Sequence, residues 1–372
     1  MTKTKPQHTF FVLSIIVLLM ACNFGAVDLS GGGGLSPTEE PVFETASPIP
    51  EDTSTPEPPP PLSGHIAFTS ARDGNKNLYV MNADGSGQFA LINGDSEDET
   101  PVWAPDGVHI ALASTRNENT DIYIVNIVTG VVTRLTDDPA RDAAPSWSPD
   151  GSRLAFESFR DGNLEIYVTN ADGSSLMRLT NNPAGDTNPV WSPDGTSIAF
   201  MSRRDSENAD IYLISPDGTG LNQLTSHAPP ESNPVWSPDG SRIAFRTYPV
   251  QGVAYICVMN RDGSNSQCLN TDSQWDNGIP SWSPDGQWLA YRSFREEPNI
   301  NLVNINDGTL TYLNGMVPIK GDPIWSPDGY RLVYQADAGG NMELFQIVIS
   351  TQDVTQLTNS PGYDGEPSWS AY

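Results

Sequence analysis

Seven acidic residues at regular spacing are the first candidates for chemistry in this sequence. Each lies shortly before a proline, and the set comprises Asp98, Asp142, Asp186, Glu231, Asp276, Asp322 and Asp364. Carboxylates that a fold gathers into one ring can bind a cation or act as acids and bases. The alternative is that they pair with basic residues of nearby loops, namely Arg72, Arg116, Arg160, Arg203 and Arg295. We favour the pairing and keep the ring as a candidate channel site.

Other catalytic patterns do not emerge. No G-x-S-x-G motif occurs, so a serine nucleophile on a sharp strand-to-helix turn is not predicted. A three-histidine metal site is also not predicted, because the chain after its leader retains only His65, His109 and His227. The stretch from Asp73 to Asn77 begins like a calcium loop but lacks the glutamate at the twelfth position. We therefore predict no catalytic residue, no metal ligand and no cofactor, with Ca²⁺ as a minor alternative.

The elements that must position these residues are set by an internal repeat. Tryptophans recur 43 to 46 residues apart at Trp103, Trp147, Trp191, Trp236, Trp282, Trp325 and Trp369. Six of the seven begin the motif W-[SA]-P-D-G, and small-aromatic pairs such as Ala155-Phe156 recur in step with them. Periods of this length indicate a repeat architecture. We interpret the tryptophans and the small-aromatic pairs as packing between repeats.

One unit, residues 145–180, shows the local structure. Short strands are predicted around Trp147, over 153–158, over 165–170 and over 176–180, with tight turns at the P-D-G and A-D-G motifs. Four antiparallel strands per unit predict an all-β propeller blade. The N-terminal half-unit lacks a tryptophan strand, and Trp369 lies on a strand without followers. Together they make one blade, which gives seven blades closed by the two ends of the chain.

The repeat W-S-P-D-G…I-A-F…R-D-G…I-Y-V-x-N-A-D-G…R-L-T resembles the WD-repeat-like propellers of the TolB type over residues 64–372. The resemblance implies a propeller that recognises a partner in the cell envelope. Propellers of that type have six blades behind a small α/β domain, whereas this sequence predicts seven blades behind a tether. A role in the Tol–Pal system is therefore in doubt.

Two cysteines occupy matching positions around one predicted turn. Cys257 lies six residues before Gly263, and Cys268 lies five residues after it. Positions at these offsets face each other across a hairpin, within reach of a disulfide. We predict a structural disulfide, since the leader described next directs the chain to an oxidising compartment. The alternative is two buried thiols.

The N-terminus has the features of a lipoprotein leader. Residues 1–21 combine two lysines with a short apolar run, and Leu19 to Cys22 resembles a bacterial lipobox. We predict lipidation of Cys22 and an extracytoplasmic, membrane-anchored location, with an ordinary signal peptide as the alternative. Residues 22–63 are rich in glycine and proline and predict a tether.

Charge excludes one class of partner. The formal net charge is −27, and removal of the leader leaves 17 basic against 46 acidic residues. Nucleic-acid binding needs the opposite sign. We expect a monomer that binds an envelope protein or an extracellular polymer.

The loops opposite the P-D-G turns vary most over blades 4 to 6. Long variable loops on a rigid scaffold often bind ligands. The candidate rim residues are His227, Tyr248, Trp275, Met316 and Ile319. The sequence thus predicts a non-catalytic recognition or scaffolding protein that binds a protein or a glycan through this loop face. The alternative is a metal-dependent polysaccharide-active enzyme that uses the acidic ring.

Overall fold

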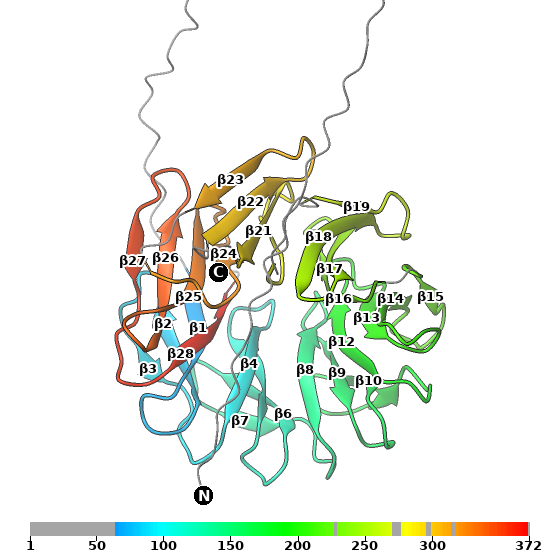
Figure 1. Cartoon of the computed structure of the whole chain (residues 1–372). Helices are drawn as coiled ribbons and strands as arrows, with labels where there is room; N and C mark the ends of the chain where they lie inside the picture. The colour runs from blue at the N-terminus through cyan, green and yellow to red at the C-terminus, as the bar shows by residue number, and fades with distance from the viewer. Residues whose placement is uncertain (1–63, 227–228, 270–276, 295–298, 314–316, 371–372) are drawn as a thin grey trace, which may run out of the picture. The chain divides into compact units, whose positions relative to one another are not determined.

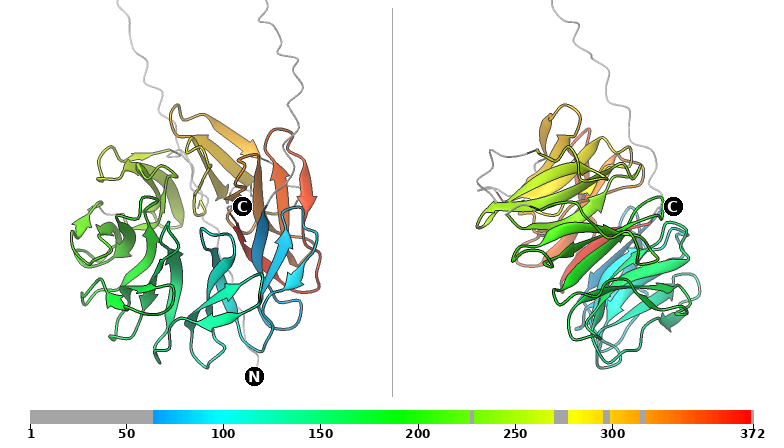
Figure 2. Two further views of the ribbon diagram at one scale, coloured as in Figure 1. Left: turned by 180° about the vertical axis from the view of Figure 1, so that it is seen from behind. Right: turned by 90° about the vertical axis from the view of Figure 1, so that its right-hand side faces the viewer.

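A computed structural model describes residues 64–226, 229–269, 277–294, 299–313 and 317–370. These residues form seven sheets of four antiparallel strands each. The sheets follow one another around a ring in chain order (Figures 1 and 2). The predicted all-β, seven-bladed propeller is confirmed. The described segments contain no helix long and apolar enough to cross a membrane.

Within each blade the tryptophan strand forms one edge, and a strand of two to four residues forms the opposite edge. Blade 1 consists of β28 (Asp364–Trp369), β1 (His65–Ser70), β2 (Asn77–Asn82) and β3 (Phe89–Ala90). Blade 2 consists of β4 (Asp98–Trp103), β5 (His109–Ser114), β6 (Asp121–Asn126) and β7 (Val132–Arg134). Blade 3 consists of β8 (Asp142–Trp147), β9 (Arg153–Ser158), β10 (Glu165–Asn170) and β11 (Met177–Arg178). Blade 4 consists of β12 (Asp186–Trp191), β13 (Ile198–Ser202), β14 (Asp210–Ile214) and β15 (Asn222–Gln223).

The three remaining blades keep the same strand order. Blade 5 consists of β16 (Glu231–Trp236), β17 (Arg242–Val250), β18 (Val253–Asn260) and β19 (Gln267–Cys268). Blade 6 consists of β20 (Ser281–Trp282), β21 (Trp288–Ser293), β22 (Asn299–Asn304) and β23 (Leu310–Leu313). Blade 7 consists of β24 (Ile324–Trp325), β25 (Arg331–Asp337), β26 (Met342–Val348) and β27 (Val354–Gln356).

The two ends of the described chain complete blade 1 together. Ile66 on β1 pairs with Trp369 on β28, and Ser70 pairs with Asp364. The Ser370 amide donates to the His65 carbonyl at 2.9 Å. In Figure 1 the blue β1 and the red β28 therefore lie side by side. The predicted closure of the ring by its own termini is confirmed.

Many of the acidic residues are aspartates that accept hydrogen bonds within the P-D-G turns. In blade 3, Asp150 Oδ1 accepts hydrogen bonds from the Ser148 hydroxyl at 2.6 Å and from the Ser152 amide at 3.0 Å. These bonds, with that from the Ser152 hydroxyl, lower the pKa of Asp150 to about 2. Gly151 closes the turn with a φ of 70°, in the left-handed region that glycine adopts without strain. These aspartates are structural, so net charge overstates any acidic binding surface.

The hydrophobic core lies between the blades. The described residues form seven core clusters, and each cluster joins neighbouring blades around the ring. Ala155 and Phe156 on β9 illustrate why: Phe156 packs toward blade 2 and Ala155 toward blade 4. A single four-stranded sheet exposes two apolar faces, so it is stable only between two neighbours. The small-aromatic pairs are thus confirmed as packing between blades.

The tryptophan side chains also link the blades through hydrogen bonds. Five indole Nε1 atoms donate to a backbone carbonyl of the preceding blade's tryptophan strand. The donor–acceptor pairs are Trp103–Ser368 at 3.0 Å, Trp147–Val102 at 3.2 Å, Trp236–Val190 at 3.2 Å, Trp282–Val235 at 3.0 Å and Trp325–Ser281 at 3.0 Å. Trp191 Nε1 is buried without such an acceptor. We call these five contacts the indole links.

The indole link predicts unequal costs for the same substitution at two blades. Trp282→Phe removes the link to the Val235 carbonyl, whereas Trp191→Phe removes no hydrogen bond. We expect Trp282→Phe to lower the free energy of unfolding by about 1 kcal/mol more than Trp191→Phe. Urea unfolding of both variants measures the difference. Equal losses would show that the links contribute nothing beyond packing.

Candidate functional site

The acidic positions nearest the blade junctions are ion-paired. Asp98, Asp142, Asp186 and Asp364 are fully buried. Each carboxylate accepts from an arginine of the loop between the second and third strands. The pairs are Arg116–Asp98 at 2.7 Å, Arg160–Asp142 at 2.9 Å, Arg204–Asp186 at 2.7 Å and Arg72–Asp364 at 3.0 Å. These four carboxylates therefore stabilise the loops instead of forming an open ring in the channel.

Asp186 pairs with Arg204, so the sequence-based pairing with Arg203, which is exposed, is wrong. The signal that identifies the correct residue is a Ser-x-Arg motif. In blade 4 the Arg204 Nε donates to Ser202 Oγ at 2.9 Å, and its Cζ lies 4.9 Å from the centre of the Tyr212 ring. The equivalent arginines of blades 1, 2 and 3 lie over Tyr79, Tyr123 and Tyr167 at 4.6 to 4.9 Å.

In two blades the residue at the ring position is not the predicted carboxylate. Asn277 and Ile319 form the bridges to the second strand where other blades place the buried carboxylate. Asp276 lies outside the described residues, and Asp322 lies 3.6 Å from Arg292 Nε. The ring position is therefore neutral in blades 6 and 7. A strict offset of five residues before each tryptophan would have identified Asn277 but not Ile319, because blade 7 shifts by one residue.

A second set of buried carboxyl groups was not predicted. It begins the third strands of blades 2, 3, 4 and 7, at Asp121, Glu165, Asp210 and Glu343. The alternation of apolar residues along a strand does not reveal these carboxyl groups, because they lie at the ends of strands and not on one face of a sheet. Glu165 accepts from the Thr180 hydroxyl at 2.6 Å, and Arg178 binds the same carboxylate at 2.8 Å.

The pair formed by Asp210 and Glu231 is unusual because neither carboxyl has an arginine partner among the ion pairs of the described chain. Glu231 Oε2 accepts from the Thr225 hydroxyl at 2.7 Å, and the two carboxyl groups are hydrogen-bonded to each other. Burial, with the nearby Asp210 carboxyl, raises the pKa of Glu231 to about 8. The described residues contain no group of three or more His, Cys, Asp or Glu side chains placed to hold a metal ion.

The structure divides the predicted rim residues. His227, Trp275 and Met316 lie outside the described residues. Tyr248 is half-buried on β17, because β17 and β18 extend the blade 5 hairpin to a tight turn at Gly252. Ile319 is fully buried in the core between blades 6 and 7. Its place on an exposed rim is wrong, because it fills the register position that carries a carboxylate elsewhere.

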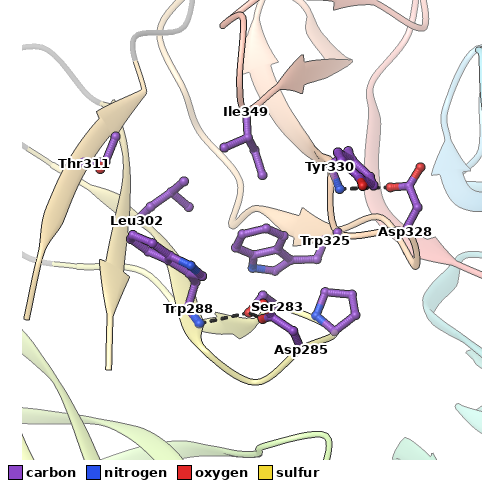
Figure 3. A pocket seen from close by; sticks show the side chains of 11 residues that line it. Ser283, Asp285, Trp288, Leu302, Thr311, Trp325, Asp328, Tyr330 and Ile349 are labelled. Atoms are coloured by element: carbon purple, nitrogen blue, oxygen red, sulfur yellow. Dashed lines mark hydrogen bonds between the residues drawn. The ribbon is translucent and has the colours of Figure 1, made fainter. Parts of the chain in front are cut away.

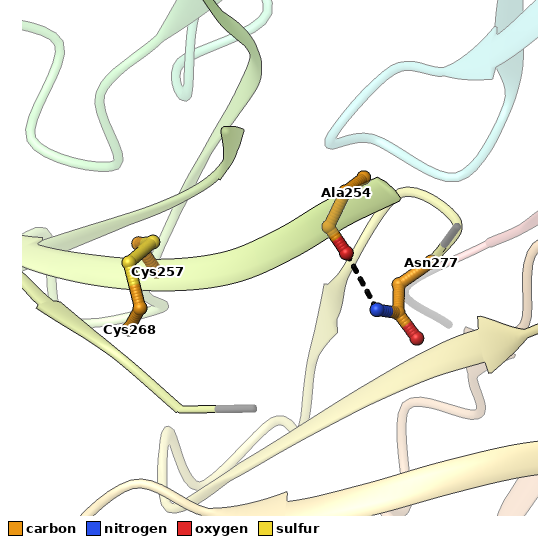
Figure 4. The surroundings of a disulfide bond; sticks show 4 residues. All are labelled: Ala254, Cys257, Cys268 and Asn277. Atoms are coloured by element: carbon orange, nitrogen blue, oxygen red, sulfur yellow. Dashed lines mark hydrogen bonds between the residues drawn. A yellow bond between two sulfur atoms is a disulfide. The ribbon is translucent and has the colours of Figure 1, made fainter. Parts of the chain in front are cut away.

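The two cysteines face each other on β18 and β19. Cys257 and Cys268 are register partners and are joined by a disulfide (Figure 4). β19 is only two residues long, so the bond fixes the short edge strand of blade 5. On the other side of this blade, Asn277 Nδ2 donates to the Ala254 carbonyl at 2.6 Å and links blade 6 to blade 5.

A cleft of about 450 Å³ opens between blades 6 and 7, on the face that carries the P-D-G turns. Its walls include Trp288, Trp325 and Tyr330 (Figure 3). Leu302 and Ile349 form an apolar base, and Asp285 adds a carboxylate at the edge. Asp285 Oδ1 accepts from Ser283 and from the Gln287 amide. We call this site the blade 6–7 cleft.

The same cleft occurs elsewhere in the repeat. Between blades 2 and 3 it is lined by His109 and Trp147, and between blades 4 and 5 by Arg261. Strand register makes His109 the counterpart of Trp288 and Trp147 the counterpart of Trp325. Clefts with exposed aromatic walls recur in ligand-binding sites. The blade 6–7 cleft is distinguished by Trp288 and Tyr330, the latter 48% exposed.

Comparison with known families places the fold. The family model described as the TolB β-propeller domain matches residues 137–251 and 250–371. The chain belongs to the TolB β-propeller domain family. Among curated proteins, no sequence matches it.

Solved structures of similar fold include TolB proteins and enzymes. TolB from Acinetobacter baumannii superposes with a TM-score of 0.56 and 22% identity, over 83% of this chain and 67% of that one. An oligogalacturonate lyase from Vibrio parahaemolyticus superposes with a TM-score of 0.62 and 15% identity, over 79% of this chain and 86% of that one. Two structures of puromycin hydrolase superpose with TM-scores of 0.65 and 0.63 and identities of 16% and 15%, each over 81% of this chain and 53% of that one. At these identities the likeness shows the shared propeller alone.

The Asp210–Glu231 pair predicts a pH-dependent stability. In the unfolded chain Glu231 titrates near its ordinary value of 4.5, whereas in the folded chain it retains its proton to about pH 8. Between these values the folded state binds more protons, so the free energy of unfolding contributed by this group falls as pH rises. Urea unfolding from pH 4 to 9 should show that fall in the wild type. Glu231→Gln, which keeps a hydrogen-bond donor toward Asp210, should lack it. A constant difference between the two proteins across this range would contradict the assignment.

Proposed function

We propose that this protein is a non-catalytic recognition protein of the cell envelope and that its partner binds in the blade 6–7 cleft. The observation that carries the proposal is the concentration of exposed aromatic surface there. Trp288, Trp325 and Tyr330 come from two different blades and line one cleft. Aromatic anchors in a preformed cavity supply much of the binding energy at protein interfaces. The propeller holds both walls on rigid strands.

This proposal moves the binding surface from the loop face to the P-D-G face. Of the candidate rim residues on the loop face, Ile319 is buried and Tyr248 is half-buried. Four arginines on that side are held by buried carboxylates, so they are not available to a partner; these are Arg72, Arg116, Arg160 and Arg204. The P-D-G face instead carries short turns of fixed geometry, and a substitution in one repeat alters one cleft without changing the others.

The enzyme alternative has weaker support. It requires an acidic channel ring, and four of the proposed ring carboxylates pair with arginine. Recognition needs no cofactor. In our proposal Cys22 carries the lipid anchor, residues 22–63 separate the propeller from the membrane, and one copy of the chain is the functional unit. These segments precede the described residues.

Site-specific photocrosslinking tests the proposal in the cells that produce the protein. A photoreactive phenylalanine analogue replaces Tyr330 in the full chain, and a second protein carries it at Ser152, the matching position of the blade 2–3 cleft. We expect one dominant crosslinked partner from position 330 and none of that partner from position 152. The crosslink should disappear when Trp288→Ala is added.

The result that would overturn the proposal is the same set of products from both positions, or no product from position 330. Thermal unfolding of each purified protein provides the control, because a destabilised propeller would lose crosslinks at every position. The lipid anchor is tested separately by the mass of the mature N-terminal peptide.

A further inference from the structure

In two counterpart clefts an arginine of this protein stacks on the tryptophan. Between blades 4 and 5, the Arg261 Cζ lies 5.4 Å from the centre of the Trp236 ring. Arg261 Nη1 binds Asp194 Oδ2 at 2.5 Å, and Nη2 binds Ser197 Oγ at 2.9 Å. The guanidinium therefore stacks on the blade's tryptophan and pairs with the P-D-G aspartate of the preceding blade.

A second cleft uses a different arginine for the same contact. Between blades 3 and 4, the Arg153 Cζ lies 4.8 Å from the centre of the Trp191 ring. Arg153 comes from the start of the second strand of blade 3, whereas Arg261 follows the third strand of blade 5. Two positions in the repeat thus deliver a guanidinium to the tryptophan. Stacking of this kind is favourable because the ring face carries negative charge.

In the blade 6–7 cleft both of these positions are apolar. Trp288 occupies the position of Arg153, and Ile349 occupies the position of Arg261. The other half of the arrangement is retained, because Trp325 corresponds to Trp236 and Asp285 corresponds to Asp194. No cation–ring contact joins a described arginine or lysine to Trp325.

Trp325 is also more exposed than five of its six counterparts, whereas Trp369 is half-buried as well. Trp103, Trp147, Trp191, Trp236 and Trp282 are 5% to 9% exposed, whereas Trp325 falls outside the buried class. The cleft beside it has a volume of about 450 Å³, which is large enough for a long side chain. Among the described residues, its tryptophan thus lacks the arginine that stacks on Trp191 and on Trp236.

We propose that the blade 6–7 cleft binds an arginine side chain of a partner protein. The guanidinium would stack on Trp325 and pair with Asp285, as Arg261 does with Trp236 and Asp194. Trp288 and Tyr330 would enclose the aliphatic part of the side chain. A net charge of −27 favours a basic partner by long-range attraction. This inference rests on the proposed function, since it names the chemistry recognised at the same site.

Neutral ligands that stack on tryptophan are the main competitors. A sugar ring or a proline would also contact Trp288 and Trp325, but neither carries the charge that Asp194 binds in the counterpart cleft. Planar guanidinium groups combine stacking with paired hydrogen bonds to a carboxylate. A capped citrulline has the shape of a capped arginine without its charge, so it separates the two explanations.

The experiment titrates N-acetyl-arginine-methylamide into the full mature chain and follows the indole N–H signals by NMR. We expect shifts confined to Trp288 and Trp325, and at least tenfold weaker binding of the citrulline analogue. Trp288→Arg should abolish binding, because it supplies the guanidinium that blade 3 carries at this position. His109→Arg, the same change in the blade 2–3 cleft, is the matched control and should leave binding unchanged.

Asp285→Asn provides a second variant that keeps the aromatic walls, and it should weaken arginine binding at least tenfold while leaving citrulline binding unchanged. Equal binding of arginine and citrulline at Trp325 would overturn the inference while leaving the cleft as a recognition site. Absence of arginine binding at millimolar concentration would overturn it as well. The proposed function is tested separately, because it would be contradicted by the absence of a photocrosslinked partner at position 330.

Discussion

The structure depends on the contact that each blade makes with its neighbour through the tryptophan at the end of its first strand. No four-stranded sheet in this chain can bury both of its faces alone, so stability comes from the junctions and not from the blades. At five junctions the indole Nε1 also donates to the preceding tryptophan strand, as Trp282 does to the Val235 carbonyl. Because each blade supplies one tryptophan and receives the next, the ring is complete only when β28 pairs with β1.

That constraint also produces the candidate site. At three of these junctions a cleft lies on the P-D-G face, between the turn of one blade and the third strand of the next. Arg153 and Arg261 cover Trp191 and Trp236 at two junctions. In the blade 6–7 cleft Trp288 and Ile349 occupy the covering positions, and the strand register is unchanged. Repetition therefore lets a single blade acquire a binding role while its neighbours preserve the fold.

The fold could be predicted from the sequence because its determinants are local and repeated. The spacing of Trp103 to Trp369 gives the blade count, and the incomplete first and last units give the closure. The site could not be predicted in the same way, because it depends on which residues differ between equivalent positions. Trp288 occupies a position where other repeats carry Arg153 or His109, and only the strand register shows that this position borders a cleft. Ile319 shows the reverse case, since an apolar residue in a variable loop occupies a buried strand position.

The central claim is that the tryptophans of the blade 6–7 cleft are more accessible than the tryptophans at the other junctions. Hydroxyl-radical footprinting of the folded protein measures the oxidation of each tryptophan side chain by mass spectrometry. We predict that Trp288 and Trp325 oxidise several times faster than Trp147, Trp191, Trp236 and Trp282. Equal rates across these six residues would contradict the account, because the blade 6–7 cleft would then be no more accessible than the rest of the ring.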